Sequence, residues 1–473
     1  MLRVLALSAA LGAASARDLS LKLTKVSQTT SPRAKCIDGT APAYYWRDGV
    51  ADGAKSAVLF LEGGGWCYPS EVLQSTGANC AYRAKSGLGS SKGYDPSIAS
   101  MGYEGGTGYT SGLPNVTKWA NWATAYVKYC DGGSMTGTRA TSTPARNGTG
   151  PLWYRGHYNI VAQLDSMVAT KGLATYKEII LSGCSAGGMA CCTCCLPVAV
   201  SAAAAADPSS TDLKCEFVST YFAKHSIPVK CICDAGLFLD VDTVTGAGNV
   251  MQKRYHDIAN VMESKPGLSP SCLNGETTWQ QCMFSEHSLK YSPVPTFVIN
   301  SLYNFGEWAQ LAPIYPAGTF PPDTGTPPKD WLKCYPANGQ LTPTSYKLCN
   351  ATQKTLIQGF RKQFIEAISV VVDPKTPHGC FVDSCPNQHC QTSSGWNQVV
   401  VNGKMMRDAA ADWYFKNSTE KSVDAPFAAP TVNPTCGFHK NQLPMCNNCA
   451  NGGLGSNCPW SEAKQRFTGL DGK

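Results

Sequence analysis

The stretch Leu181-Ser-Gly-Cys-Ser-Ala-Gly-Gly188 decides the fold that this sequence predicts. It holds a Gly-x-Ser-x-Gly pattern centred on Ser185, after the apolar run Tyr176-Lys-Glu-Ile-Ile-Leu181 and before an alanine-rich segment, residues 186–206, where we expect a helix. A serine on a tight strand-to-helix turn is a nucleophile elbow, in which the flanking glycines let strand and helix approach closely. We therefore predict that Ser185 is a nucleophile at a helix N-terminus, where the helix dipole favours developing negative charge.

Other apolar runs extend this prediction to the whole chain. Residues 56–61 and 296–300 are nearly continuous apolar runs, which is typical of strands buried on both faces of a parallel sheet. Residues 159–171 and 355–371 have the apolar spacing of helices. The sequence therefore predicts an α/β-hydrolase-like fold, with a mostly parallel sheet flanked by helices and with disulfide-braced loops.

Cysteine content and the N-terminal residues point to export. The chain has 473 residues and 23 cysteines, too many for an ordinary cytosolic enzyme, whose thiols are kept reduced. Residues 1–16 join an apolar run to a small-residue triplet and are predicted to be a signal peptide, so the protein is expected to be secreted. Residues 17–416 are assigned to one hydrolase-like domain and 417–473 to a Cys-rich C-terminal extension pinned by disulfides. Four glycan acceptor patterns begin at Asn115, Asn147, Asn350 and Asn417.

The charge pattern restricts the kind of partner. The net charge of +7 is spread along the chain, whereas nucleic-acid binding would need clustered basic residues. What remains is a hint of weak affinity for an acidic polymer. No later segment offers 18 uninterrupted apolar residues, so no transmembrane segment is expected.

A second glycine cluster, Leu61-Glu-Gly-Gly-Gly-Trp-Cys67, follows the first strong strand. Acyl transfer needs backbone N–H groups directed at the oxygen of the tetrahedral intermediate, and α/β hydrolases take them from two places. We expect Ala186, after the nucleophile, to supply one donor, and Gly64, Gly65 or Trp66 to supply the other. Phosphate binding is the rival interpretation, but no Gly-Lys-Ser/Thr follows the cluster.

A base and an orienting acid should follow the nucleophile in the order serine, acid, histidine. His389 lies in a loop dense with cysteines that could hold an imidazole in place, and His378 is close by, so the residues alone leave both open as the base. The acid should follow the predicted strand at 296–303, where Glu307 is the first carboxylate and Asp323 the next. Glu307 is the simpler choice.

The cysteines near the elbow allow other readings. Cys184 could be a rival nucleophile, but we expect it to be a small buried apolar residue. The clusters Cys191-Cys-Thr-Cys-Cys195 and Cys446-Asn-Asn-Cys449 could bind zinc, yet disulfides are the better interpretation in an exported protein. No metal or other cofactor is predicted, and an odd count leaves at least one thiol unpaired.

Six blocks in the sequence resemble the pectin acetylesterase family, which includes plant enzymes and the animal Wnt deacylase Notum. They occur in the family's order over about four fifths of the chain. The blocks are Leu61-Glu-Gly-Gly-Gly-Trp-Cys67, Tyr129-Cys-Asp-Gly-Gly-Ser134, Tyr154-Arg-Gly-His157, Leu181-Ser-Gly-Cys-Ser-Ala-Gly-Gly188, Val229-Lys-Cys231 with Asp234-Ala-Gly236, and His389-Cys-Gln391.

The resemblance implies a Ser-Asp-His triad that cleaves O-acyl esters. It assigns Ser185 as the nucleophile and favours His389 over His378, and it implies oxyanion-hole positions at Gly65, Trp66 and Ala186. The departure is the acid, because the family has Tyr/Phe-Asp where this chain has Tyr303-Asn304. An asparagine there tends to hold the wrong imidazole tautomer, at a cost of roughly 10⁴ in rate in a serine protease. We therefore expect Glu307 to be the acid, with Asn304 as the alternative.

The resemblance also suggests the substrate. It favours acetyl esters of a cell-wall polysaccharide such as pectin. Separately, we expect the protein to be a monomer. The alternatives are a Notum-like deacylase of a lipidated protein, a catalytically impaired binding member of the fold, and a serine peptidase or lipase, because fold does not fix substrate.

Overall fold

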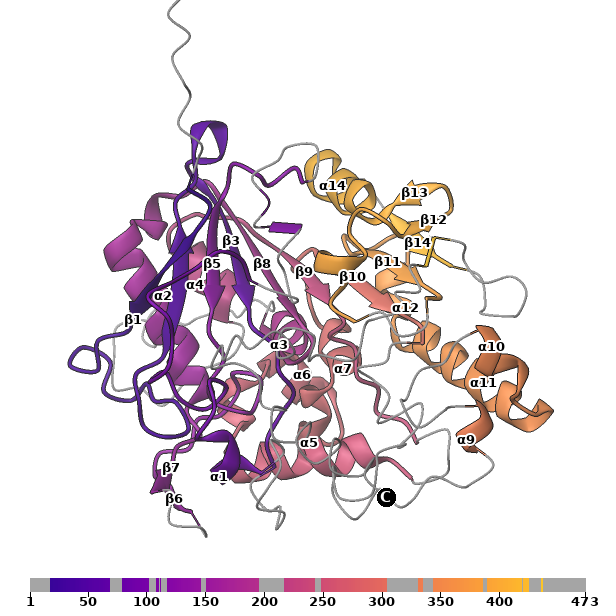
Figure 1. Ribbon diagram of the computed structural model, residues 1–473, viewed down its shortest axis with the longest axis horizontal. Helices are drawn as coiled ribbons and strands as arrows, with labels where there is room; N and C mark the ends of the chain where they lie inside the picture. The colour runs from indigo at the N-terminus through magenta and orange to yellow at the C-terminus, as the bar shows by residue number, and fades with distance from the viewer. Residues whose placement is uncertain are drawn as a thin grey trace, which may run out of the picture.

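A computed structural model of the chain is organised around one large sheet (Figure 1). The structure describes residues 18–68, 79–101, 108–109, 111, 117–145, 150–194, 217–242, 248–303, 331–334, 343–385, 389–418, 420–424 and 435–436. In this part of the chain the sheet has ten strands in the order β14-β11-β10-β9-β8-β3-β5-β2-β1-β4. The strands are β1 Leu21–Lys25, β2 Ala43–Arg47, β3 Ser56–Leu61, β4 Ser97–Ile98, β5 Ala123–Val127, β8 Glu178–Cys184, β9 Val229–Asp234, β10 Thr296–Ser301, β11 Gly379–Asp383 and β14 Lys421–Val423.

The strands from β14 to β5 are parallel to their neighbours, whereas β2, β1 and β4 add an antiparallel edge. β8 lies near the centre and precedes the elbow. This confirms the predicted α/β-hydrolase-like class, and β3 and β10 coincide with the apolar runs that predicted them. Two small ribbons complete the described strands: β6 Thr143–Pro144 with β7 Pro151–Leu152, and β12 Val400–Val401 with β13 Lys404–Met405.

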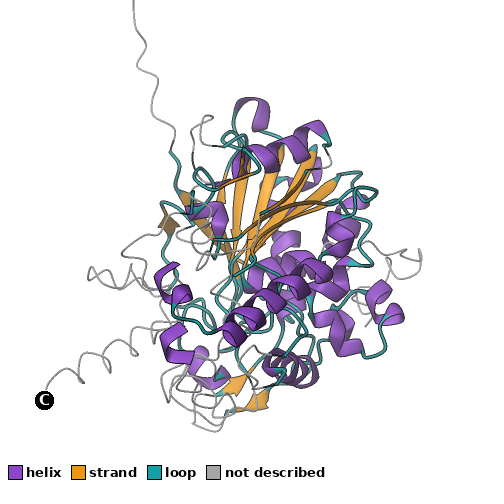
Figure 2. Cartoon of the chain, turned by 90° about the vertical axis from the view of Figure 1, so that its right-hand side faces the viewer, coloured by secondary structure: helices purple, strands orange, loops and turns teal. Residues whose placement is uncertain are grey.

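Helices cover both faces of the sheet (Figure 2). The longer ones are α2 Gly156–Lys171, α3 Ala186–Cys194, α5 Val250–Val261, α11 Ala351–Ala367 and α14 Met406–Lys416. The shorter ones are α1 Cys80–Arg83, α4 Phe217–Ala223, α6 Pro270–Gly275, α7 Ser285–Leu289, α9 Trp331–Cys334, α10 Pro343–Lys347, α12 Ser369–Val372 and α13 Gln391–Ser394.

Two large apolar clusters lie on opposite faces of the sheet. They are separate because successive residues of a strand point to opposite sides. Leu59 and Leu181 belong to one apolar cluster with residues of α2, α3 and α11. Phe60 and Ile180 belong to the other, with residues of α14. All six residues of β3 are buried, which explains why its sequence is a continuous apolar run instead of an alternating one.

Disulfides connect loops that are distant in sequence. Those with both partners described are Cys36–Cys130, Cys67–Cys80, Cys184–Cys390, Cys272–Cys282, Cys334–Cys349 and Cys385–Cys436. Cys231 is disulfide-bonded as well. Buried thiols remain at Cys192, Cys233 and Cys380. Several disulfides therefore brace the segments singled out by the sequence, although Cys192 departs from the pairing expected for its cluster.

The chain after residue 416 takes part in the main sheet. β14 pairs with β11, and Cys436 is bonded to Cys385, so the sheet extends beyond the predicted domain boundary. The other cysteines of the predicted extension, and the predicted signal peptide at 1–16, lie outside the described residues. Within the described part, no helix is both long and apolar enough to cross a membrane.

Candidate active site

Ser185 occupies the turn between β8 and α3 in a left-handed backbone conformation, with φ of +59°. A Cβ at Gly183 would overlap the backbone of Gly187, and a Cβ at Gly187 would overlap the carbonyl oxygen of Leu61. Both positions therefore require glycine. A non-glycine residue with positive φ is strained, and such strain concentrates at functional sites. The predicted tight, strained turn at the elbow is present.

His389 follows β11 at the carboxyl edge of the sheet, the edge at which β8 delivers Ser185. A disulfide joins Cys184, directly before the nucleophile, to Cys390, directly after the histidine. A ring nitrogen of His389 lies within 4.8 Å of the Cys184 sulfur. Burial lowers the pKa of His389 to about 4, so its imidazole is neutral at neutral pH and can accept a proton.

The disulfide corrects one prediction about Cys184. We expected a small buried apolar residue, but its sulfur is bonded to Cys390, because β8 and the histidine loop meet at this edge. Cys184, His389 and Cys390 have the donor types of a metal site. Both sulfurs are consumed by the disulfide, and therefore these three residues do not offer thiolate ligands.

His378 lies at the opposite edge of the sheet. It precedes β11, and its Nδ1 accepts a hydrogen bond from the N–H of Thr296 at 3.3 Å, at the start of β10. Both strands run toward the edge that carries the elbow. Of the two histidines left open by the sequence, only His389 is at the same edge as Ser185.

Asp234 connects the elbow to the histidine loop. Its main-chain oxygen accepts a hydrogen bond from the N–H of Ser185 at 3.0 Å. Its carboxylate accepts from both the N–H and the hydroxyl of Thr392, at 2.7 and 2.8 Å. The side chain is fully buried, and burial raises its pKa to about 6. Sequence reasoning assigned no role to Asp234; its signal was its place in one of the family-like blocks.

The glycine-rich loop after β3 is held by its carbonyl groups. Arg83 donates to the oxygens of Gly64 and Gly65 at 2.9 and 3.2 Å, and the Tyr129 hydroxyl donates to Gly65 at 2.9 Å. In a trans peptide the N–H points opposite to the C=O. The N–H groups of Gly65 and Trp66 therefore point away from Arg83 and Tyr129. Neither of these two anchoring residues was assigned a function from the sequence.

Trp66 is fixed by both its indole ring and its indole N–H. Nε1 donates to the Ser134 hydroxyl at 2.7 Å, and that hydroxyl donates to the Ala186 carbonyl at 2.8 Å. The ring packs edge-on against Phe238 and Tyr255. Because the indole N–H is engaged, the backbone N–H of Trp66 remains as its candidate oxyanion donor. Ser134 also ties the glycine-rich loop to the start of α3.

A buried ion pair anchors the start of the same loop. The Glu62 carboxylate pairs with Lys128 and also accepts from the Tyr126 hydroxyl at 3.1 Å and the Tyr129 N–H at 2.8 Å. Both charged side chains are almost completely buried. A buried charge needs such a full set of partners, and removing one partner is strongly destabilising. The pair therefore fixes the point where the loop leaves β3.

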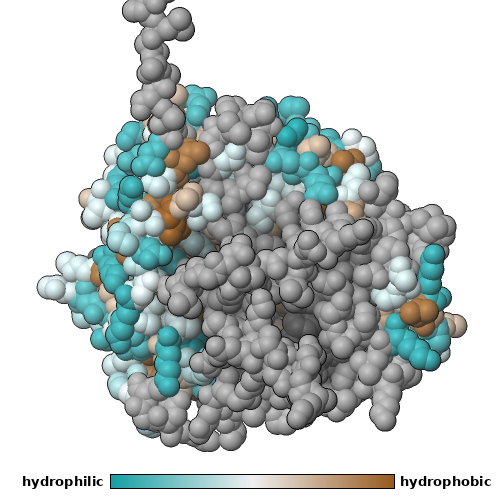
Figure 3. Space-filling view, in the orientation of Figure 1, coloured by the Kyte–Doolittle hydropathy of each residue, from teal (hydrophilic) through white to brown (hydrophobic). Residues whose placement is uncertain are grey.

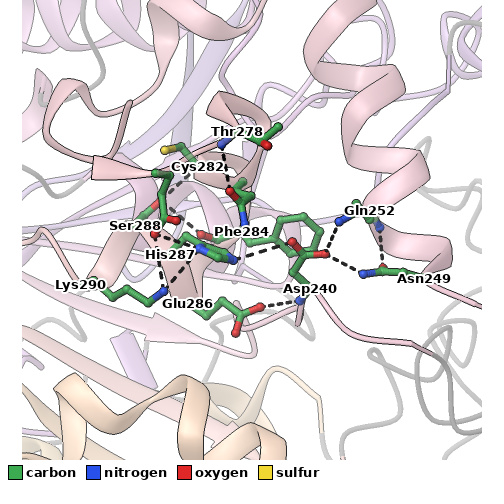
Figure 4. A network of polar contacts seen from close by, with 12 residues as sticks. Asp240, Asn249, Gln252, Thr278, Cys282, Phe284, Glu286, His287, Ser288 and Lys290 are labelled. Atoms are coloured by element: carbon green, nitrogen blue, oxygen red, sulfur yellow. Dashed lines mark hydrogen bonds and ion pairs between the residues drawn. The ribbon is translucent and has the colours of Figure 1, made fainter. Parts of the chain in front are cut away.

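Figure 4 shows a polar network that supports the segment after β9. From α7, His287 contacts Glu276 at 2.9 Å and Asp240 at 3.7 Å. Asp240 also accepts from Asn249 at 2.6 Å and from Gln252 at 3.0 Å. The network holds the chain just beyond Phe238, the residue that packs against Trp66. The His287 imidazole therefore contacts carboxylates of this network through both ring nitrogens.

Both candidates for the triad acid, Asn304 and Glu307, lie outside the described residues, which end at 303 in this segment. β10 lies between β9 and β11 and ends at Ser301 on the same carboxyl edge. The segment that follows β10 thus begins beside the strand that precedes His389.

Comparison with known proteins identifies the family of this chain. The family model described as Pectinacetylesterase matches residues 14–437. The chain belongs to the pectin acetylesterase family. Two relatives from Arabidopsis thaliana, pectin acetylesterases 5 and 7, are each 30% identical over 423 and 424 residues, covering 88% of this chain and 84% and 93% of their own lengths.

More distant family relatives carry another name. The palmitoleoyl-protein carboxylesterase notum2 of Xenopus laevis is 25% identical over 454 residues, covering 92% of this chain and 74% of its own. A solved structure of the Wnt deacylase Notum from Drosophila superimposes with a TM-score of 0.61 at 18% identity, covering 86% of this chain and 96% of the other. That structure supports the fold of this family member.

Proposed function

We propose that the protein is a secreted serine esterase that removes acyl groups, most readily acetyl, from a cell-wall polysaccharide such as pectin. Family membership supports an O-acyl esterase. The observation that carries the proposal is the disulfide between Cys184 and Cys390, which tethers the flank of Ser185 to the flank of His389. The disulfides and the predicted signal peptide support export.

Ser185 attacks the ester carbonyl while His389 takes the hydroxyl proton as a general base. The carbonyl oxygen becomes an oxyanion that accepts hydrogen bonds from the N–H of Ala186 and from an N–H of Gly64, Gly65 or Trp66. His389 then returns the proton to the departing alcohol. Water, activated by His389, hydrolyses the acyl-enzyme and releases the carboxylic acid and free Ser185.

The low pKa of His389 keeps its imidazole unprotonated before the first step. A neutral imidazole is the form that accepts the Ser185 proton, and burial keeps this form dominant down to about pH 4. A carboxylate beside the imidazole would stabilise the imidazolium formed in the transition state. We propose Glu307 for this role; in the alternative, the neutral amide of Asn304 orients the imidazole without supplying charge.

The nucleophile is tested with Ser185→Ala and a chromogenic acetate ester. We expect turnover to fall by at least 10³-fold, together with loss of fluorophosphonate labelling. Ser166→Ala, on α2, is the matched control and should keep full activity. Undiminished hydrolysis by the Ser185 variant would exclude this nucleophile.

Two further variants decide the acid. We expect Glu307→Gln to lose most activity and Asn304→Ala to retain it. An inactive Asn304→Ala beside an active Glu307→Gln would transfer the role to Asn304. If wild-type Ser185 is not labelled by fluorophosphonate at all, the protein is a catalytically impaired binding member of the fold.

Product analysis separates the substrate classes. Acetate release is measured from acetylated pectin and acetylated xylan, beside release of fatty acid from a palmitoleoylated peptide. We expect pectin to be the best substrate. Preference for the fatty-acylated peptide would favour the deacylase activity for which the Notum relatives are named.

A further inference from the structure

Five side chains beside the N-terminus of α2 alternate between cations and aromatic rings. The Arg33 guanidinium lies 4.1 Å from the ring centroid of Tyr158, and Arg155 lies 5.4 Å from that centroid and 5.2 Å from the Trp153 ring. Lys35 caps the other end, 4.9 Å from the Trp153 ring. We call the series Lys35, Trp153, Arg155, Tyr158 and Arg33 the cationic ladder. Such contacts order the cations without neutralising them.

The ladder carries three positive charges; Glu263 acts on Arg155 electrostatically, without an ion-pair contact. Among the described residues, no carboxylate lies within ion-pair distance of Arg33, Lys35 or Arg155; the neighbouring Arg139 pairs with Glu263. Every member except Arg155 is partly exposed. The left-hand side of Figure 3, over β1 and α2, is mainly hydrophilic. The ladder is thus a local concentration of positive charge in a chain whose net charge of +7 is otherwise dispersed.

Backbone contacts connect the ladder to the glycine-rich loop. Trp153 donates its N–H to the oxygen of Ile37, and Ile37 donates to the oxygen of Cys130, both at 2.9 Å. Two residues on, Gly132 accepts from the N–H of Cys67 at 3.0 Å. The disulfides Cys36–Cys130 and Cys67–Cys80 brace the segments that make this series of hydrogen bonds. The ladder therefore keeps a fixed position relative to residues 63–66 of the candidate active site.

We propose that the cationic ladder is a binding site for an acidic polysaccharide, a chain of uronate sugars with a carboxylate on each ring. Guanidinium and ammonium groups pair with carboxylates through charge-assisted hydrogen bonds. The rings of Trp153 and Tyr158, each contacted by two cations, hold these cations in place for the polymer. A site of this kind holds the polymer beside the glycine-rich loop while successive ester groups reach Ser185. The proposal rests on the proposed polysaccharide substrate, but binding is measurable without catalysis.

The test uses the full chain carrying Ser185→Ala, so that bound polymer is not processed. Its binding to de-esterified, unacetylated polygalacturonate is measured by calorimetry at low and moderate salt, beside neutral galactan, heparin and single-stranded RNA. Arg33→Gln with Lys35→Gln removes two charges from the ladder. Lys347→Gln with Lys362→Gln, on α10 and α11, removes the same two charges from exposed positions elsewhere.

We expect polygalacturonate to bind, the ladder variant to bind at least tenfold more weakly, and the control variant to bind within twofold of the parent. Added salt should weaken binding because the pairs are partly exposed. With Ser185 restored, the ladder variant should hydrolyse a small acetate ester at the parental rate. If the chain with an intact ladder and Ser185 does not hydrolyse the small ester, the proposed function is contradicted. That result would not bear on the ladder.

Three results would overturn the proposal. The first is no detectable binding of polygalacturonate, and the second is equal weakening in the ladder and control variants, which would indicate general charge attraction. The third is tighter binding of heparin or RNA, which would assign the ladder to a different polyanion. Trp153→Ala checks the rings: weaker binding would support their role in holding the cations, and unchanged affinity would contradict it.

Discussion

His389 is buried at the carboxyl edge of the sheet. Its lowered pKa predicts the direction in which kcat/KM changes with pH. The free base is required, and its pKa is lowered to about 4, so kcat/KM should stay high at mildly acidic pH and fall only as the pH drops through about 4. The measurement is kcat/KM for a small acetate ester from pH 3.5 to 8. An unperturbed histidine would instead lose activity near pH 6.5.

His378 supplies the control for that profile. Its pKa is also lowered to about 4, by burial and by Lys421, but it lies at the other edge of the sheet. His378→Gln should not change the pH at which kcat/KM falls on the acidic side. A fall in kcat/KM centred at pH 6.5 or above contradicts the prediction. A fall near pH 6 that disappears in Asp234→Asn would be assigned to titration of Asp234.

Tyr129 acts through the glycine-rich loop. Its hydroxyl donates to the Gly65 carbonyl and accepts from the Ser134 N–H at 3.0 Å. Tyr129→Phe removes both bonds and loosens the peptide groups that face away from it. Since deletion of one oxyanion donor costs about 10²–10³ in turnover, we expect a displaced one to cost about tenfold in kcat, with KM little changed.

Tyr44→Phe is the matched substitution for this comparison. Tyr44 bonds Ser166 and Thr170 on α2, away from the glycine-rich loop. The control should retain parental kcat. A Tyr129→Phe enzyme that changes only in KM, or that matches Tyr44→Phe, would remove Tyr129 from the positioning of the loop.

At the scale of elements, the decisive connection is the one between the elbow and the histidine loop. Cys184→Ser with Cys390→Ser removes the covalent tether, leaving Asp234 and Thr392 as the described link between the two segments. Because a misplacement of about 1 Å can cost 10² in rate, we expect kcat to fall 10- to 100-fold. Rates are normalised to the folded fraction, measured by near-ultraviolet circular dichroism, since loss of a long-range disulfide also lowers stability.

Cys334→Ser with Cys349→Ser is the control pair. It removes a disulfide that joins α9 to the turn between α10 and α11. This variant should lose stability without the same loss of normalised kcat. Equal normalised kcat in both double variants would show that the Cys184–Cys390 bond serves only the stability of the fold.

The sequence predicted elements better than connections between them. β3 and β10 were predictable because strands buried on both faces leave continuous apolar runs. The turn at Ser185 was predictable because Gly183 and Gly187 are required by close contacts that any sequence with this turn must satisfy. The partner of Cys184 was not, since disulfide connectivity cannot be deduced from spacing.

The role of Asp234 escaped prediction for a related reason. It depends on the pairing of β8 with β9 and on the return of the chain near Thr392, 158 residues later. Likewise, Arg83 reaches the glycine-rich loop only through the folded course of the segment that includes α1. Long-range placement of this kind leaves no local periodicity in the sequence.

For the whole molecule, buried histidines and buried aspartates oppose each other in the dependence of stability on pH. Burial lowers the pKa of His157, His378 and His389 to about 4, so between about pH 6.5 and 4 the unfolded chain binds protons there that the folded chain does not. Burial raises the pKa of three aspartates, to about 6 for two and about 7 for the third, so the folded chain binds protons there that the unfolded chain does not. These are Asp131, Asp234 and Asp383. Near pH 5 the two sets cancel.

These opposing pKa shifts predict opposite slopes of relative unfolding free energy against pH for two single variants. The free energies are measured by urea unfolding at pH 4.5, 5.0, 5.5 and 6.0 with the disulfides intact. Asp383→Asn removes a proton from the folded state only, so its stability relative to the parent should rise with pH by about 1.4 kcal/mol per pH unit. His157→Gln removes a proton from the unfolded state only, so its relative stability should fall with pH by a similar amount. The slopes stay informative even if both variants are destabilised overall, because an overall loss shifts a curve without tilting it. Curves parallel to the parent in both variants would mean that these buried groups titrate as they do in the unfolded chain.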